Sequence, residues 1–219
     1  MSDASRPKLV FVHGLWMTGA EAFSLRRRLE REHGFDTELF AYRTTRDPLE
    51  AVAERLQQRV SALARQGAKG VHLVAHSLGG LVVLACLEQF DALMPPGRIV
   101  LLGAPVQGSA AARVAGAIGV GQWLIGPSAA EALVSHRRRV APASREVGTI
   151  AGTRPMGLGR WFARFDEPND GSVAVSETQL EGARDRLVLP VSHLGMLMSP
   201  RVAEACGHFL REGRFSLQA

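Results

Sequence analysis

The sequence predicts an α/β fold in which a mostly parallel central sheet is flanked by helices. Short runs of β-branched and other apolar residues alternate with stretches in which apolar residues recur at helical spacing. Repeated strand-helix units of this length favour parallel strands with helices on both faces of the sheet. Because 46% of the 219 residues are hydrophobic, we expect one compact domain over residues 1–219.

The expected strands are short, apolar and bounded by turn residues. They cover residues 8–12, 36–42, 71–75, 98–102, 147–152 and 187–191. The first one ends in the sequence HGLW, and the third one runs directly into HSLGG. Both sequences therefore lie where a strand of the sheet gives way to a loop or helix.

Helices are expected between these strands. Phe23, Leu25 and Leu29 stand among charged residues after the first strand, and a second helical pattern begins near Pro48 and stops near Gly67. Two more helices are expected at residues 81–90 and 201–211. Residues 106–144 interrupt the alternation and are rich in Ala and Gly, so we interpret them as a helical lid or cap insert.

The chain shows no pattern of secretion or membrane insertion. Its N-terminal segment carries an acid and a proline rather than the apolar run of a signal peptide, and no apolar run approaches the roughly 20 residues that span a bilayer. Cys86 and Cys206 lie on expected helices far apart in sequence, which favours buried thiols over a disulfide framework. We therefore expect a cytoplasmic protein.

The net charge of +5 is the excess of 26 Lys and Arg residues over 21 Asp and Glu residues, and some of the arginines are clustered, as at residues 26–28 and 137–139. Solvated helix faces commonly carry such clusters, and few aromatic residues accompany them. We expect no nucleic-acid partner, because stacking aromatics are missing from the pattern. Adsorption to a lipid surface would need an exposed amphipathic face, which the Gly- and Ala-rich insert does not indicate.

The sequence from Val74 to Gly80 has the pattern of a nucleophile elbow. Ser77 stands between an expected strand and an expected helix, with small residues two positions before and after it. Small neighbours are needed because the sharp turn brings the helix close to the strand. Ala75 stands where the first glycine is usual. Ser77 is therefore the candidate nucleophile of a serine hydrolase.

A serine hydroxyl needs a base to remove its proton and a carboxylate to orient that base. His193 follows the last expected strand and precedes the final helix, which suits the base, and His33, His72, His136 and His208 are less well placed for this role. Asp170 lies in a turn 23 positions before His193 and is the favoured acid, with Asp166, Glu167 and Asp185 as rivals. The order serine, acid, histidine is typical of this kind of site.

Acyl transfer also needs donors for the developing oxyanion, usually two backbone amides. The amide of Leu78 stands at the start of the helix after Ser77, where the helix dipole adds positive charge. We assign the second amide to Leu15 in the loop after the first strand, with Trp16 as the alternative.

At this point the chain resembles the α/β-hydrolase family, and within it the small bacterial lipases and esterases whose elbow begins with alanine. Four motifs match in order and are followed by His193: FVHGLW at 11–16, AHSLGG at 75–80, GAPVQGS at 103–109 and NDGSVAVS at 169–176. The resemblance implies hydrolysis of small-molecule or lipid carboxylic esters through an acyl-enzyme, with Ser77, Asp170 and His193 as the triad and Leu15 and Leu78 as oxyanion amides. It implies no cofactor.

Two expectations concern the surroundings of this site. No acidic cluster has the spacing of a calcium loop, so we predict no metal. A lid over residues 106–144 would shield an acyl pocket formed by Trp16, Val114, Ile118 and Trp123, although the last three equally suit the packing of a cap helix. The alternatives to an esterase are a peptidase or acyltransferase on the same fold and a noncatalytic binding protein.

Overall fold

The computed structural model describes residues 6–108, 139–156 and 166–216. Its centre is a parallel sheet whose strands follow the order β2-β1-β3-β4-β5-β6. The strands are β1 Lys8–Val12, β2 Asp36–Phe40, β3 Val71–His76, β4 Ile99–Leu102, β5 Val147–Gly152 and β6 Asp185–Leu189. All carboxyl ends of the strands therefore lie at one edge of the sheet, where parallel α/β folds place their sites.

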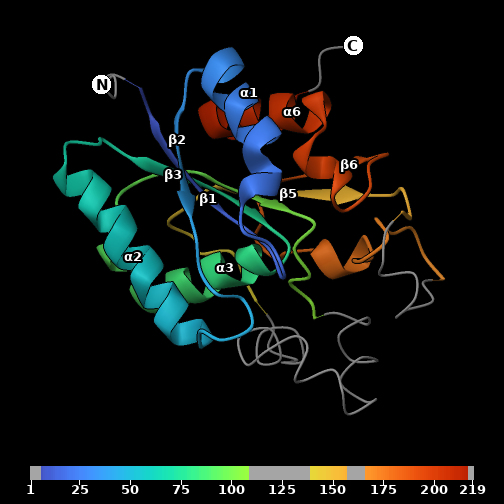
Figure 1. Ribbon diagram of the computed structural model, residues 1–219, viewed down its shortest axis with the longest axis horizontal. Coiled ribbons are helices and arrows are strands. Elements are labelled where there is room, and N and C mark those ends of the chain that lie inside the picture. The colour runs from blue at the N-terminus through green and yellow to red at the C-terminus, as the bar shows by residue number, and fades with distance from the viewer. Residues whose placement is uncertain (1–5, 109–138, 157–165, 217–219) are drawn as a thin grey trace.

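Helices cover both faces of the sheet (Figure 1). The four α-helices of the described residues are α1 Phe23–His33, α2 Leu49–Arg65, α3 Leu78–Phe90 and α6 Pro200–Glu212. Single 3-10 turns occur at η1 Ala20–Ala22, η2 Asp91–Leu93, η4 Ser176–Thr178 and η5 Gly195–Leu197. The mostly parallel α/β fold expected from the sequence is confirmed.

Strand β1 shows why two apolar layers form. Its successive side chains point to opposite faces, so Val10 and Val12 pack with α2 and α3, whereas Leu9 and Phe11 pack with α1 and α6. All four side chains are fully buried. A strand buried on both faces needs a continuous apolar run rather than an alternating one, which is what residues 9–12 supply.

The final helix has clear sequence signals at both ends. The hydroxyl of Ser199 accepts a hydrogen bond from the Val202 amide, and Pro200 occupies the first turn. Gly213 ends α6 in the left-handed conformation at φ 73°. These signals place the helix one residue beyond the predicted 201–211 at each end.

Other predictions were wrong at element boundaries. The last strand was expected at 187–191 but runs from Asp185 to Leu189, and the third helix begins at Leu78 rather than at residue 81. The proposed insert 106–144 lies largely outside the described residues, and the described residues 139–144 are not helical. Within the described part of the chain, no helix is long and apolar enough to cross a membrane.

The two cysteines are free and buried. Cys86 lies on α3 and Cys206 on α6, and neither side chain is exposed to solvent. The expectation of buried thiols rather than a disulfide is confirmed. Burial raises the pKa of the Cys86 thiol to about 12, and it also raises the pKa of Cys206.

Candidate active site

Ser77 stands at the sharp turn between β3 and α3. Its φ of 54° and ψ of −124° are rarely adopted by residues other than glycine. The Ser77 amide donates to the carbonyl of Leu102 at 2.9 Å, and the Gly80 amide donates to the carbonyl of Ser77 at 3.0 Å. The neighbouring strand and the helix thus hold the serine in a strained conformation at the carboxyl edge of the sheet.

The glycines after Ser77 allow the helix to pack against the sheet. A Cβ at Gly79 would lie 2.4 Å from the carbonyl oxygen of Val12 and 2.6 Å from that of His13. A Cβ at Gly80 would lie 2.5 Å from the Cβ of Ala104. By contrast, Ala75 is accommodated in the core with no exposed surface. The turn therefore requires glycine after Ser77, on the helix side, but accepts alanine before it, on the strand side.

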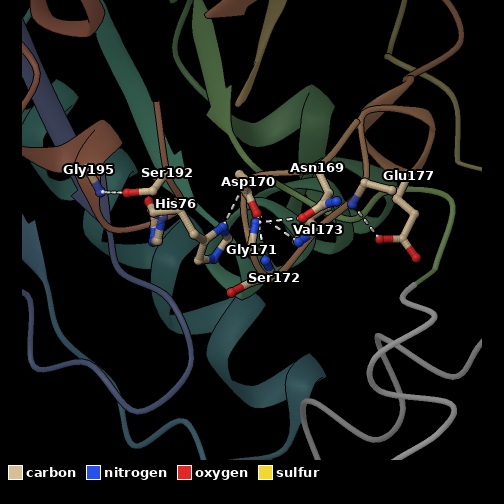
Figure 2. A network of polar contacts seen from close by, with 11 residues as sticks. His76, Asn169, Asp170, Gly171, Ser172, Val173, Glu177, Ser192 and Gly195 are labelled. Carbon is tan, nitrogen blue, oxygen red and sulfur yellow. Dashed lines mark hydrogen bonds and ion pairs between the residues drawn. The ribbon is translucent and has the colours of Figure 1, made fainter. Parts of the chain in front are cut away.

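Asp170 and His193 form a close pair. The Nδ1 of His193 lies 2.7 Å from Oδ2 of Asp170, and the Asp170 carboxylate is almost completely buried. Figure 2 shows Asp170 among the neighbours with which it makes polar contacts. An ionised carboxylate only accepts hydrogen bonds, so Nδ1 carries the proton and Nε2 keeps its lone pair. The amides of Ser172 and Val173 donate to Oδ1 of Asp170 at 2.9 and 2.8 Å. The backbone of this turn thereby fixes the carboxylate.

Backbone contacts also join the two loops that carry this pair. The His193 amide donates to the carbonyl oxygen of Asp170 at 2.9 Å. Gly103, just after β4, has a φ of 53°, and a Cβ there would lie 3.0 Å from Oδ2 of Asp170 and 3.1 Å from Nδ1 of His193. Gly103 thus leaves the space that the pair occupies.

The loop after β1 reaches the same place. A Cβ on Gly14 would lie 3.0 Å from the Cβ of Ser77. The next amides differ in their partners: the Trp16 amide donates to the hydroxyl oxygen of Thr44 at 3.2 Å, whereas the Leu15 amide has no acceptor among the described residues. The Leu78 amide at the start of α3 likewise has none there. This pattern favours Leu15 over Trp16 as an available donor.

His76, immediately before Ser77, is a neighbour of His193 that the sequence analysis did not single out. The ring centroids of the two histidines are 4.5 Å apart, and Nε2 of His76 lies 3.0 Å from the carbonyl oxygen of His193. Since a carbonyl only accepts, Nε2 carries the proton and Nδ1 is unprotonated; this buried Nδ1 has no partner among the described residues. Burial lowers the pKa of His76 well below its usual value, and the nearby His193 lowers it further.

His13 supports the loop after β1 from inside. Its Nδ1 donates to the Gly14 carbonyl at 3.0 Å, and its Nε2 accepts from the Tyr42 amide at 3.2 Å. The ring stacks on Tyr42 with centroids 4.5 Å apart. Burial lowers the pKa of His13, so the ring is neutral and can make both bonds.

The rival acids lie elsewhere. Asp166 and Glu167 are exposed, and Glu167 accepts from the Ser176 hydroxyl at 2.7 Å. Asp185 accepts from the Phe215 amide at 2.7 Å. No hydrogen bond or ion pair joins any of these three described residues to His193.

The remaining predicted positions are less well defined. The predicted pocket residues Val114, Ile118 and Trp123 lie outside the described residues, while the Trp16 side chain is 59% exposed. Within the described ranges, no group of three His, Cys, Asp or Glu residues is arranged to hold a metal ion.

Comparisons with known proteins place the chain in a family. The sequence profile of the alpha/beta hydrolase family matches residues 9–212. No curated protein matches the sequence. Mature lipase BlEst2 of Bacillus licheniformis superposes with a TM-score of 0.75 at 20% identity, with 97% of this chain and 94% of that one covered.

Two further solved structures share the fold. The metagenomic carboxyl esterase MGS0156 has a TM-score of 0.65 at 21% identity, with 96% of this chain and 77% of that one covered. The RedJ thioesterase of the prodiginine pathway in Streptomyces coelicolor has a TM-score of 0.56 at 14% identity, with 93% and 91% covered. Identities this low show only a shared fold. The family profile, however, extends over most of the sequence, and the chain therefore belongs to the α/β-hydrolase family.

Proposed function

We propose that this protein is a serine hydrolase that cleaves carboxylic esters through an acyl-enzyme on Ser77. The observation that carries the proposal is the contact of 2.7 Å between His193 and the buried Asp170, at the sheet edge where Ser77 occupies its strained turn. Geometry of this kind is the usual means of activating a hydroxyl that is a weak nucleophile by itself.

The first half of the reaction forms the acyl-enzyme. Nε2 of His193 accepts the proton of the Ser77 hydroxyl while Oγ bonds to the carbonyl carbon of the ester. The tetrahedral oxyanion is stabilised by the amides of Leu15 and Leu78, which have no other acceptor among the described residues. Collapse of this intermediate breaks the ester C–O bond, and the imidazolium of His193 gives its proton to the departing alkoxide.

The second half returns the enzyme to its starting state. Water gives a proton to Nε2 of His193 and attacks the acyl carbon. Collapse of the second intermediate breaks the bond between the acyl carbon and Oγ, Nε2 returns its proton to Oγ, and the carboxylic acid leaves. Asp170 acts in both halves because its carboxylate holds the imidazole and stabilises its positive form. Loss of that carboxylate in comparable triads costs about 10⁴ in kcat.

Ester substrates are favoured by the character of the solved neighbours, which include a lipase, a carboxyl esterase and a thioesterase. A thioester reacts through the same steps with a thiolate leaving group. A peptidase would have to protonate a much poorer amine leaving group in the same geometry. An acyltransferase would replace the second water by another alcohol. These activities are the alternative outcomes of the test below.

The test combines hydrolysis with covalent labelling. The wild-type protein is expected to hydrolyse p-nitrophenyl esters and to be labelled by a fluorophosphonate probe, and Ser77→Ala is expected to lose both. Ser61→Ala, on α2, is the matched control and should retain both. Peptide anilides and thioesters are assayed in parallel. Cleavage of anilides alone would overturn the esterase proposal, and a folded wild-type protein that neither hydrolyses nor labels would identify a noncatalytic protein.

A further inference from the structure

A cleft of about 760 Å³ opens beside the loop that carries the Leu15 amide. One wall comes from the segment after β1 through His13, Met17 and Thr18, and the other comes from residues 41–47 after β2; Arg55 of α2 also lines the cleft. The volume is in the range of small-ligand sites. Because β1 and β2 are adjacent parallel strands, the cleft lies at the same sheet edge as Ser77.

The cleft is within reach of a substrate bound at Ser77. β2 is two strands from β3, and neighbouring strands are about 4.8 Å apart, so the loops after β2 and β3 are separated by about 10 Å. Between them passes the loop of Gly14, whose backbone abuts Ser77. The hydrogen bond from the Trp16 amide to Thr44 ties the two walls together. A ligand that extends from Ser77 across this loop would enter the cleft.

The charges in the cleft are unbalanced. Asp47 is its single carboxylate and is shared by two arginines: Oδ1 accepts from Arg43 Nε at 3.1 Å and Oδ2 from Arg55 Nη1 at 2.8 Å. Desolvation would raise the pKa of Asp47, but the hydrogen bonds from the Arg43 amide and the two guanidinium groups outweigh it and lower that pKa. Arg46 has no carboxylate partner among the described residues. Three cations against one anion leave an excess of two positive charges.

The loop that carries Arg46 is held by its own backbone. The amides of Arg46 and Asp47 both donate to the carbonyl of Arg43 at 3.0 Å. In return the Arg43 amide donates to Oδ2 of Asp47 at 3.1 Å. The exposed Arg46 therefore lies on a turn whose backbone is already fixed by hydrogen bonds. Binding of a ligand then costs less conformational entropy than it would on a flexible loop.

We propose that this cleft binds a carboxylate or phosphate group carried by the ester substrate about 10 Å from the scissile bond, with Arg46 as the selecting residue. The inference rests on the proposed function and names its substrate class. Arginine and the threonine hydroxyls at 18, 44 and 45 supply donors for an anionic oxygen.

The proposal is tested with matched substrates. p-Nitrophenyl monoesters of dicarboxylic acids of increasing length are compared with their methyl-capped, neutral counterparts. At low ionic strength the wild-type kcat/KM is expected to favour the anionic member by about fivefold to tenfold at the length that reaches the cleft. The preference should shrink with added salt, since an exposed arginine is screened.

Variants separate Arg46 from the general positive charge of the chain. Arg46→Gln should bring the anionic-to-neutral ratio of kcat/KM close to one, and Arg46→Lys should restore part of the ratio. Arg65→Gln at the far end of α2 removes the same charge and should leave the ratio as in the wild type. Acetyl esters of ω-hydroxy carboxylates and of ω-hydroxyalkyl phosphates carry the anion on the alcohol part of the ester. Their hydrolysis is monitored through the protons that it releases. Comparison with the p-nitrophenyl monoesters shows whether the anion belongs to the acyl or the alcohol side.

Failure of this inference differs from failure of the proposed function. Ser77-dependent hydrolysis with an anionic-to-neutral ratio near one at every length, unaffected by Arg46→Gln, would overturn the proposed anion site. The proposed esterase activity would still stand. If no ester is hydrolysed, binding of the same monoesters to Ser77→Ala and to Ser77→Ala/Arg46→Gln tests the proposed anion site independently of catalysis. Equal dissociation constants for these two variants would overturn it, and weaker binding on loss of Arg46 would support it.

Discussion

The Nε2 of His76 lies 3.0 Å from the carbonyl oxygen of His193, although the two residues are 117 positions apart in the chain. This contact joins the residue before the candidate nucleophile to the backbone of the candidate base. It therefore holds the two elements that must meet for proton transfer, and it does so from a fully buried position.

Replacement of His76 by phenylalanine is expected to lower kcat about tenfold with little change in KM, because one buried hydrogen bond of about 1.4 kcal/mol is lost from the His193 loop. Glutamine carries an N–H donor at similar reach and should retain most of the activity. Steady-state kinetics on one ester, with urea unfolding of both variants, checks this. Equal loss of kcat in both variants at equal stability would rule out a positioning role for the donor.

Gly103 and Gly67 form a natural pair for testing steric space at the site. Both have positive φ, at 53° and 100°, so an alanine at either position costs about 1 kcal/mol or more in backbone strain. Only at Gly103 would the new Cβ meet Asp170 and His193; at Gly67 there is nothing within 4 Å.

Gly103→Ala should therefore lower kcat/KM by about 10² through displacement of the pair, whereas Gly67→Ala should lose stability alone. Activity assays and thermal unfolding of the two variants separate the effects. Full activity in a folded Gly103→Ala variant would show that the pair tolerates the displacement or is not used.

Asp170→Asn tests the role of the carboxylate with little change in shape. The amides of Ser172 and Val173 select the oxygen of the new amide group, which turns its NH₂ toward Nδ1 of His193. Nδ1 must then accept, the proton moves to Nε2, and the base can no longer take the proton of Ser77. We expect a loss of about 10⁴ in kcat. Asp166→Asn, at an exposed rival position, should stay active; the reverse result would exchange the two assignments.

His72 predicts an acid-sensitive fold. Its Nδ1 accepts from the Arg98 amide at 3.1 Å, and burial, together with the charge of Arg98, lowers its pKa to about 4. The unfolded chain binds a proton at this residue below about pH 6.5, whereas the folded chain does so only near pH 4. The stability contributed by His72 is therefore complete above pH 6.5 and falls as the pH drops toward 4.

His72→Gln keeps an acceptor for Arg98 but does not titrate. Between pH 7 and pH 5 the wild-type protein should lose about 2 kcal/mol more unfolding free energy than this variant. Urea unfolding at the two pH values measures the difference. The same pH dependence in both proteins would show that His72 is not the residue responsible.

Element types followed from the sequence more reliably than element ends. The bounds of β1 were predicted correctly because residues 8–12 are continuously apolar after Lys8. β6 was placed two residues late because it is an edge strand with alternating exposure, and its polar first residues Asp185 and Arg186 resemble a loop. α3 begins at the elbow with Gly79 and Gly80, which are poor helix formers kept there by close packing.

At the site, local patterns were informative and long-range contacts were not. Ser77 could be proposed because its strand, turn and glycines are consecutive. Asp170 was favoured over Asp166 because it lies in a motif that resembles the family's, but its contact with His193 depends on the geometry of a loop, which the sequence does not specify. The contacts of Gly103 with the acid-base pair and of His76 with His193 join distant segments, and no periodicity or spacing in the chain marks them.

The two buried cysteines make this chain convenient for site-directed spectroscopy. Neither thiol is exposed, and their raised pKa values disfavour the thiolate that reacts with maleimides. A cysteine introduced at an exposed position would be the reactive thiol of the native protein. A fluorophore attached through Arg46→Cys would then report from the mouth of the cleft without removal of any natural cysteine.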